Sequence, residues 1–453
     1  MSPKGKAPNI LFLMSDEHRP DIAGFLGNQL VRTPVLDDLA STATVFDNAY
    51  TPSPICIPAR QSIAAGKFPR SLGVEHFGQD LEPGYLTFAR TFSQHGYQTV
   101  ACGKLHHLGQ DQMQGWRRRI GAEQEVGSSF IGDRDDRDFS RFVSPGVHKW
   151  SMIDEIKNSG LKENTWGLDD ALAVEGALVF IDRFFQDEAY GRATPDVPLL
   201  LKVSLNEPHY PFATSRRELF EYYYDRVPLF TDQEFFDHPF LGGNFRARPG
   251  HEVSESEARS ATAAYYSMIE NVDERFGRII AALEDVGQNL DDWIIVYTSD
   301  HGEMLGEHGV WEKQKFFEAS VRVPLFIRAP GRLPTGRVNE NVNLCDLFAT
   351  LCELADIPIP GGLESRPLTS LFDASSSWDN ESVSQFAGSN LMIKRDALKY
   401  QYYEDDNSEI LFDLIADPTE SSNRINMPGY VEAVNNFRSR RRQLGFGMSE
   451  GSA

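Results

Sequence analysis

A cysteine, a proline and an arginine alternate with apolar residues in the stretch Cys56-Ile57-Pro58-Ala59-Arg60. The stretch follows a proline-rich approach at 51–55 and leads into a segment with the pattern of a helix start. Two interpretations are open at this point. A lone cysteine is more often a small buried hydrophobe than a reactive group, and short motifs also match by chance. Other residues of the chain are needed to distinguish a reactive Cys56 from a buried core cysteine beside a turn proline.

Ionisable side chains follow four apolar runs that have the pattern of strands buried on both faces. These runs are Asn9–Met14, Tyr97–Cys102, Leu199–Leu205 and Trp293–Thr298. The residues that follow them, in the same order, are Asp16, then Lys104 and His106, then His209, and finally Asp300 and His301. Because ligands of open α/β sheets bind outside the carboxyl ends of the strands, we expect these side chains to meet at one sheet edge.

Two carboxylates and an imidazole, from Asp16, Asp300 and His301, suit a divalent metal ion with open coordination positions. The alternative is that Asp16 caps a loop and that Asp300 and His301 only start a turn. If these three residues are considered without the rest of the chain, the loop-cap and turn interpretation is the better one. The expected convergence of four strand ends is what favours a site.

Strands that alternate with helices predict an α/β fold with a large mixed, mostly parallel sheet flanked by helices. A further strand is expected at Val323–Arg328, and a helix at Leu344–Leu354 holds two of the cysteines. The other helices are expected at Thr33–Thr44, Leu86–His95, Leu168–Gln186 and Glu255–Val286, the last ending at Gly287. Glu255–Val286 has the clearest helical periodicity.

The pattern changes near residue 365, after the turn-rich segment Ile357–Gly362. Leu391–Tyr403 and Ile410–Leu414 predict short antiparallel strands, and Val431–Leu444 predicts a closing helix. We therefore predict a catalytic domain over 1–365 and a smaller C-terminal α+β subdomain over 366–453.

Composition limits the partners and the location. The net charge of −22 argues against nucleic acid and anionic membrane surfaces. An anionic substrate can bind only if positively charged side chains and a metal ion make the electrostatic potential of one cleft positive.

The four cysteines show neither metal-finger nor disulfide spacing, and Cys102, Cys345 and Cys352 are expected in the core. No apolar run has the length of a membrane span or forms a signal-peptide core, so a cytoplasmic protein is expected. The sequence is compatible with a homo-oligomer and with a monomer.

Together these segments resemble the formylglycine-dependent sulfatases of the alkaline-phosphatase superfamily. Cys56-x-Pro58-x-Arg60 resembles the family signature, although Ala65 and Lys67 replace the usual Thr and Arg of its extended form. The other matching segments are Gly103-Lys104-Leu105-His106, Pro208-His209-Tyr210-Pro211, Thr298-Ser299-Asp300-His301-Gly302, Trp311–Glu318 and Leu411-Phe412-Asp413-Leu414. In Trp311–Glu318 the alignment favours Lys313 over Lys315 as the active-site lysine. The resemblance covers about Pro8–Pro360 and resumes near the end of the chain.

The resemblance implies an alkaline-phosphatase-like fold and hydrolysis of a small sulfate ester. A formylglycine-generating enzyme would oxidise Cys56 to an aldehyde, whose hydrate is the nucleophile. The expected metal ligands are the residue at position 56, Asp16, Glu17, Asp300 and His301, with Glu17 standing where the family usually has Asp or Gln. Calcium is the expected ion, and Mn²⁺ and Mg²⁺ are alternatives.

The resemblance also assigns roles to the remaining motif residues. Arg60 and Lys104 would hold the hydrate oxygens and the sulfate. His209 and Lys313 would position the sulfate and protonate the leaving oxygen, and His106 would be the base of the second step.

Several alternatives stay open. A phosphonate monoester or phosphodiester hydrolase of the same superfamily uses similar groups, but generally lacks the Gly-Lys-x-His motif. An inactive sulfatase-like binding protein would keep Cys56 as a thiol. Asp300-His301 and Phe316-Phe317-Glu318 resemble choline sulfatases most, whereas the shorter C-terminal end does not.

The polar segment Gln110–Asn164 and the aromatic segment Phe212–Pro249 are candidates for pocket walls or plain surface.

Overall fold

The computed structural model describes residues 7–121, 152–186, 196–231, 238 and 247–447. Within these residues a nine-stranded mixed sheet has the order β11-β2-β10-β8-β1-β6-β3-β4, and β9 pairs with β2. Its strands are β1 (Asn9–Ser15), β2 (Thr44–Tyr50), β3 (Gln98–Gly103), β4 (Arg118–Ile120), β6 (Leu199–Ser204), β8 (Trp293–Ser299), β9 (Arg322–Val323), β10 (Leu325–Arg328) and β11 (Gly336–Asn343). The predicted mixed, mostly parallel sheet is confirmed.

The central strands run parallel, and their register brings their carboxyl ends level with one another. Ile10 of β1 lies opposite Leu200 of β6 on one side and Ile294 of β8 on the other. On the far side of β6, Cys102 of β3 lies opposite Val203. The last residues of β8, β1, β6 and β3 therefore form one edge of the sheet, as the sequence predicts.

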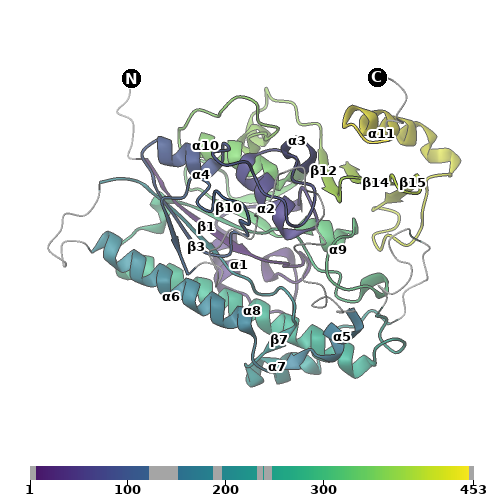
Figure 1. Cartoon of the computed structure of the whole chain (residues 1–453), viewed down its shortest axis with the longest axis horizontal. Coiled ribbons are helices and arrows are strands. Elements are labelled where there is room, and N and C mark those ends of the chain that lie inside the picture. The colour runs from purple at the N-terminus through teal and green to yellow at the C-terminus, as the bar shows by residue number, and fades with distance from the viewer. Residues whose placement is uncertain (1–6, 122–151, 187–195, 232–237, 239–246, 448–453) are drawn as a thin grey trace.

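Helices cover both faces of this sheet (Figure 1). On one face lie α1 (Pro34–Ser41), α6 (Thr165–Phe185) and α8 (Glu255–Asp285), whose apolar side chains pack against Leu11 and Leu13 of β1. On the other face lie α2 (Cys56–Ala65), α4 (Phe88–Gln94) and α10 (Leu347–Leu354), packed against Ile10, Phe12 and Met14. Alternate residues of β1 thus enter opposite cores, which explains its unbroken apolar sequence.

The long helix α8 shows how local sequence sets its ends. Ser254 and Glu257 form a capping box at its start, with the Ser254 side chain accepting from the Glu257 N–H. The apolar side chains of Val272, Phe276 and Ile279 recur at helical spacing on its buried face. Gly287, with φ 79°, follows the helix at the predicted position.

A second sheet lies beyond the first, in the order β12-β13-β14-β15. Its antiparallel strands are β12 (Glu381–Phe386), β13 (Asn390–Arg395), β14 (Leu398–Tyr403) and β15 (Ser408–Asp413). Helix α11 (Val431–Gln443) covers this sheet through Val434 and Phe437, which share a core with Leu391 and Tyr400. The predicted C-terminal antiparallel strands and closing helix are confirmed, while the domain boundary at 365 stays a prediction.

Some predicted elements differ in detail from the structure. The helix expected at Thr33–Thr44 ends at Ser41, and Thr44 already begins β2. The strand expected at Val323–Arg328 is divided at Pro324, which has no N–H to give to a ladder. Leu391–Tyr403 contains two strands that form a hairpin. The cysteines Cys102, Cys345 and Cys352 are all buried, as predicted.

Short elements complete the described chain. They are α3 (Pro69–Leu72), α5 (Met152–Lys157), β5 (Gly160–Leu161), β7 (Ala213–Thr214), α7 (Arg217–Tyr224) and α9 (Glu318–Val321). None of the described helices combines the length and apolar character that crossing a bilayer requires.

Candidate active site

The strand ends bring distant residues into contact. Asp16 follows β1, and its Oδ2 lies 2.8 Å from the Lys104 Nζ that follows β3. Gly103 lets the end of β3 lie close to the end of β6, because it has φ 81° and a Cβ there would lie 2.1 Å from the Ser204 carbonyl oxygen. Asp300 and His301 follow β8, and Asp300 Oδ1 accepts from the Glu17 N–H at 3.2 Å. The predicted convergence is therefore present.

Helix α2 begins at Cys56 and places its first two turns in the interior. Cys56 and Arg60 are 2% and 4% exposed, and a spacing of four residues puts them on the same helix face. The Arg60 guanidinium donates to Asp300 Oδ2 at 2.7 Å and to Asp16 Oδ2 at 2.9 Å. It also donates to the Lys104 carbonyl and to Ser204 Oγ, each at 2.9 Å. Arg60 thus connects α2 to four strand ends, those of β8, β1, β3 and β6.

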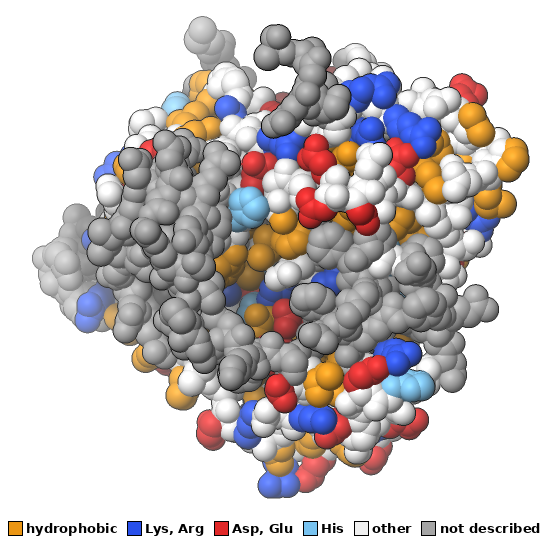
Figure 2. Space-filling model, turned by 45° about the vertical axis from the view of Figure 1, so that its right-hand side comes forward, with side chains coloured by type: hydrophobic (Ala, Val, Ile, Leu, Met, Phe, Trp, Pro, Cys, Tyr) orange, Lys and Arg blue, Asp and Glu red, His pale blue; other side chains and the backbone are white. Residues whose placement is uncertain are grey.

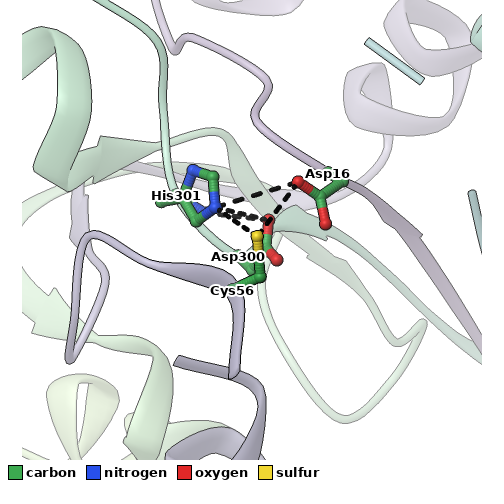
Figure 3. A group of neighbouring side chains, drawn as sticks. All are labelled: Asp16, Cys56, Asp300 and His301. Atoms are coloured by element: carbon green, nitrogen blue, oxygen red, sulfur yellow. Dashed lines mark hydrogen bonds and ion pairs between the residues drawn. The ribbon is translucent and has the colours of Figure 1, made fainter. Parts of the chain in front are cut away.

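Four buried side chains point toward one another around Cys56 (Figure 3). The Cys56 Sγ lies 3.1 Å from His301 Nε2 and 3.6 Å from Asp16 Oδ1. His301 Nε2 is 3.8 Å from one oxygen each of Asp16 and Asp300. One ligand atom from each of these four residues lies within 4.8 Å of the others, a spacing that could hold a metal ion.

The donor set fits a divalent cation. His301 Nδ1 lies 3.1 Å from the Gly302 carbonyl oxygen, so Nδ1 carries the proton and the Nε2 lone pair faces the cluster. Lys104 and Arg60 outweigh the effect of burial and hold the pKa of Asp16 well below its usual value, so this carboxylate is charged. Among the described residues no donor group bonds the buried Glu17 Oε1, and burial raises the pKa of Glu17 well above its usual value. Carboxylate oxygens and a directed imidazole nitrogen are ligands that calcium or manganese accepts.

A second group of side chains lies beside this cluster. Lys313 Nζ is 2.9 Å from Glu17 Oε2 and 2.7 Å from His209 Nε2. His209 Nδ1 lies 2.6 Å from the Tyr210 carbonyl oxygen and must donate to it, so Nε2 accepts from Lys313. Burial and the Lys313 ammonium lower the pKa of His209, which keeps the imidazole neutral. The ammonium of Lys313 is therefore the proton donor of this pair.

The structure distinguishes between the two candidate lysines. Lys315 Nζ donates to the Lys313 carbonyl oxygen at 3.1 Å, and burial lowers its pKa to about 8. It does not share the contacts with Glu17 and His209 that Lys313 makes. The geometry thus places Lys313, the lysine favoured by alignment, beside the cluster.

Comparison with known proteins now identifies the family. A family model described as "Sulfatase" matches residues 8–357, and one described as "N-sulphoglucosamine sulphohydrolase, C-terminal" matches residues 306–445. The chain belongs to the sulfatase family. The predicted family and enzyme class, a sulfuric ester hydrolase, are thereby confirmed.

Individual relatives of this sulfatase match nearly its whole length. An arylsulfatase of Clostridium perfringens (strain 13 / Type A) is 30% identical over 95% of this chain and 93% of its own. A choline-sulfatase of Rhizobium meliloti (strain 1021) is 30% identical over 93% of this chain and 83% of its own. The solved phosphonate monoester hydrolase of Agrobacterium radiobacter shares the fold, with a TM-score of 0.73 and 20% identity over 96% of this chain and 95% of its own.

The structure adds a residue that the sequence did not single out. Asp170 of α6 is fully buried, and its carboxylate accepts from the N–H groups of Asn206 and Glu207 at 2.7 and 2.9 Å. Arg275 of α8 contacts both Asp170 and Glu207. This network fixes the loop that carries His209. An acidic residue in the second turn of an amphipathic helix gives no signal of such a role.

The structure describes only parts of the two segments that we expected as pocket walls or plain surface. Gln110–Asn164 and Phe212–Pro249 each include residues outside the described ranges. Within the second segment, Tyr223 of α7 is buried and donates to Glu270 of α8, so it supports the scaffold. Aromatic rings beside His106 and His209 come from other places in the chain: Phe77 lies beside His106, and Tyr210 and Trp166 lie beside His209.

Proposed function

We propose that this sulfatase hydrolyses a small sulfate ester through a formylglycine formed from Cys56. The observation that carries the proposal is the position of Cys56, which lies between the Asp16, Asp300 and His301 ligand atoms and within one helical turn of Arg60. A nucleophile in this position shares its surroundings with groups that stabilise negative charge.

The unmodified thiol is poorly suited to the reaction. Burial and the Asp16 carboxylate raise the pKa of the Cys56 thiol well above its usual value. A thiol that stays protonated is a weak nucleophile and a weak metal ligand. An aldehyde hydrate at the same position carries two hydroxyl groups instead. This supports maturation of the chain by a formylglycine-generating enzyme, which we propose as its partner.

The residues that would hold a metal ion are Asp16, Asp300, His301 and the modified side chain of residue 56, with Glu17 at the margin. The charges of Asp16 and Asp300 are already balanced by ion pairs with Arg60 and Lys104. A divalent ion, of which calcium is our first choice, would supply Lewis acidity and lower the pKa of the attacking hydroxyl.

The proposed first step is a sulfuryl transfer, in which one deprotonated hydroxyl of the hydrate bonds to sulfur as the bond between sulfur and the ester oxygen breaks, and the remaining residues assist this step. Arg60 and Lys104 hold the hydrate oxygens and the sulfate. The Lys313 ammonium, held by Glu17 and His209, donates a proton to the leaving oxygen. In the second step the other hydroxyl of the hydrate loses its proton, and the sulfate leaves as the aldehyde re-forms. His106, which has φ 61° and lies beside the Phe77 ring, is the proposed base.

A sulfate monoester fits this site better than a phosphodiester. Lys104, His209 and Lys313 are 5%, 8% and 3% exposed, so the groups that contact the transferred unit are enclosed. A sulfate monoester brings three non-bridging oxygens to these donors. A phosphodiester brings two, and its second organic group requires space in this enclosed layer.

Parallel assays with 4-nitrophenyl sulfate and bis(4-nitrophenyl) phosphate test this proposal, since both release the same alcohol. We expect kcat/KM for the sulfate to exceed that for the phosphodiester by on the order of tenfold or more. Lys104→Ala serves as the matched variant and should lower the sulfate value more than the phosphodiester value. A preference for the phosphodiester would assign the chain to the rival reaction.

Calcium is expected to stabilise the folded protein. A ligand that binds only the native state at a hundredfold excess over its Kd adds about 2.7 kcal/mol to the free energy of unfolding. We therefore expect calcium to raise the melting temperature of chelator-treated protein, and Asp300→Asn to remove most of that increase. Asp291→Asn, a change of an exposed aspartate at the opposite edge of the sheet, is the control. An equal increase in all three proteins would contradict this metal site.

A further inference from the structure

The C-terminal sheet packs against the chain segment that carries Lys313. This segment, residues 313–318, runs from the site to the first residue of α9, and we call it the Lys313 segment. Its Phe316 and Phe317 side chains lie in one buried core with side chains of β13, β14 and β15. The Phe316 carbonyl oxygen also accepts from the Gln401 side-chain amide of β14, at 3.3 Å. The second sheet is therefore in direct contact with the segment that holds the proposed proton donor.

The Lys313 segment ends at a buried group of three charged side chains. Lys399 Nζ, from β14, lies 2.9 Å from Glu318 Oε1 and also contacts Glu420 Oε1. The other carboxylate oxygen of Glu420 accepts from the Glu318 backbone N–H at 2.6 Å. Lys399 is 0% exposed and Glu420 is 2% exposed. The backbone and the side chain of Glu318 are thus both held by the C-terminal part of the chain.

Burial distinguishes this group from the charges at the protein surface. On the face shown in Figure 2, acidic and basic side chains lie near one another in contact with water, which screens their ion pairs. A buried ion pair loses the hydration of both charges, and its attraction often does no more than offset that loss. Apolar side chains of similar size often stabilise a fold equally well. What Lys399 and Glu420 provide, and apolar residues would not, is a fixed position for Glu318.

The same segment is tied to the residues that precede Cys56. The Gln314 N–H donates to the Pro54 carbonyl oxygen at 2.9 Å. The second sheet reaches these residues too, because the Gln385 N–H of β12 donates to the Pro52 carbonyl oxygen at 2.8 Å. The C-terminal sheet therefore contacts both chain segments that lead into the site.

We propose that Lys399 and Glu420 are positioning residues, which act through Glu318 to hold the Lys313 ammonium where it can donate to the leaving oxygen. The inference rests on the proposed function, because it takes Lys313 as the proton donor. It goes beyond that function, because it makes the C-terminal sheet part of the structure that transfers the proton. The contacts of both residues are made five positions beyond Lys313 in the chain, so they are not catalytic groups themselves.

Loss of this support should displace the proton donor without removing it. Despite burial, which raises it, Lys399 and Arg322 hold the pKa of Glu318 below its usual value, so its carboxylate is charged. Without Lys399 this charge loses the ammonium group that it contacts, and we expect Glu318 to move toward solvent and draw the Lys313 segment with it. A proton donor must lie within hydrogen-bond reach of the leaving oxygen. A displacement of about 1 Å can therefore lower the rate about a hundredfold.

Two aryl sulfates with different leaving oxygens test this role. 4-Nitrophenoxide is a weak base and can leave without a proton, whereas phenoxide is a stronger base and leaves more readily with one. We expect Lys399→Met to lower kcat for phenyl sulfate on the order of tenfold more than kcat for 4-nitrophenyl sulfate, with little change in KM. Lys399→Arg keeps the charge and should restore part of the loss. Glu420→Gln keeps an acceptor for the Glu318 N–H and should show the same selective loss, but a smaller one.

Glu409→Gln is the matched control in the same sheet. Glu409 of β15 pairs with Arg438 and Arg441 of α11, on the face of the sheet opposite to the Lys313 segment. This change should lower the rates for both esters equally or not at all. If it shifts the ratio of the two kcat values as much as Lys399→Met does, loosening the sheet in general moves the proton donor, and the inference is overturned.

An equal loss on both esters in Lys399→Met would also overturn the inference, because it would mean that Lys399 only supports the fold. Unchanged rates would do the same. If Lys399→Met does not fold, Glu420→Gln, the milder change, decides between a selective and an equal loss.

If the wild type hydrolyses neither ester, the proposed function fails, and hydrogen exchange tests the positioning separately. The N–H groups of Gln314 and Glu318 are bonded in the native protein. We expect Lys399→Met to speed amide exchange in peptides covering residues 312–319 by about tenfold or more, and Glu409→Gln to leave it unchanged. Unchanged exchange in Lys399→Met would contradict the inference.

Discussion

Replacing Cys56 by serine is expected to lower turnover of a sulfate ester by on the order of 10³-fold or more. A serine offers one hydroxyl group, which can accept the sulfate but has no second hydroxyl to expel it. Release would then require water to attack a sulfated serine at a position that is only 2% exposed in the native cysteine form. Steady-state assays should show the loss, and intact-mass measurement after incubation with substrate should show a sulfated protein.

The control for this experiment is Cys352→Ser, which changes a buried cysteine of α10 that belongs to the hydrophobic core and not to the cluster, and should retain turnover. The mass of the wild-type protein is informative in the same measurement, because formylglycine is lighter than cysteine. Wild-type protein with the unmodified mass and no activity, made in a host that has the maturing enzyme, would favour the inactive binding protein. Full turnover by Cys56→Ser would exclude the formylglycine mechanism.

The general position of the site could be predicted from sequence because it follows from parallel strands. An unbroken apolar run such as that of β1 indicates burial on both faces, and parallel strands place their carboxyl ends together. Asp16, Lys104, His209 and Asp300 could therefore be placed at one edge without any contact information. Three strands of the large sheet escaped prediction: β4 and β11 lie at its two edges, and β2 lies between β11 and β10. β11, for example, has exposed residues on both sides of the buried Val338 and contains polar Asn339 and Asn341.

The contacts within the site could not be predicted, because they join residues far apart in the chain. The ion pair between Glu17 and Lys313 spans 296 positions, and its length depends on the loops that carry both residues. Asp170 is a similar case, since its partners at Asn206 and Arg275 come from another strand end and another helix. Such positioning residues lack a motif, because their role is set by geometry and not by their neighbours in sequence.

Arg60→Ala is expected to lower the free energy of unfolding of the metal-free protein by about 3–5 kcal/mol. The Arg60 side chain is 2% exposed, and both of its carboxylate partners, Asp16 and Asp300, are fully buried. Removing the guanidinium leaves two buried carboxylates, of which Asp16 keeps its ion pair with the Lys104 ammonium. Arg60→Lys should recover part of the loss, since one ammonium keeps the charge but does not reproduce the guanidinium's four contacts. Urea unfolding in the presence of a chelator measures these differences.

The matched control is Arg216→Ala, which breaks two exposed ion pairs, with Glu218 and Glu274, and should cost no more than about 1 kcal/mol. Saturating calcium provides a second, independent readout. Because a divalent ion neutralises Asp16 and Asp300 from the other side, the deficit of Arg60→Ala should shrink when calcium is present, whereas that of Arg216→Ala should not change. If Arg60→Ala unfolds within about 1 kcal/mol of the wild type without metal, then Arg60 does not balance the charge of this site in the folded protein.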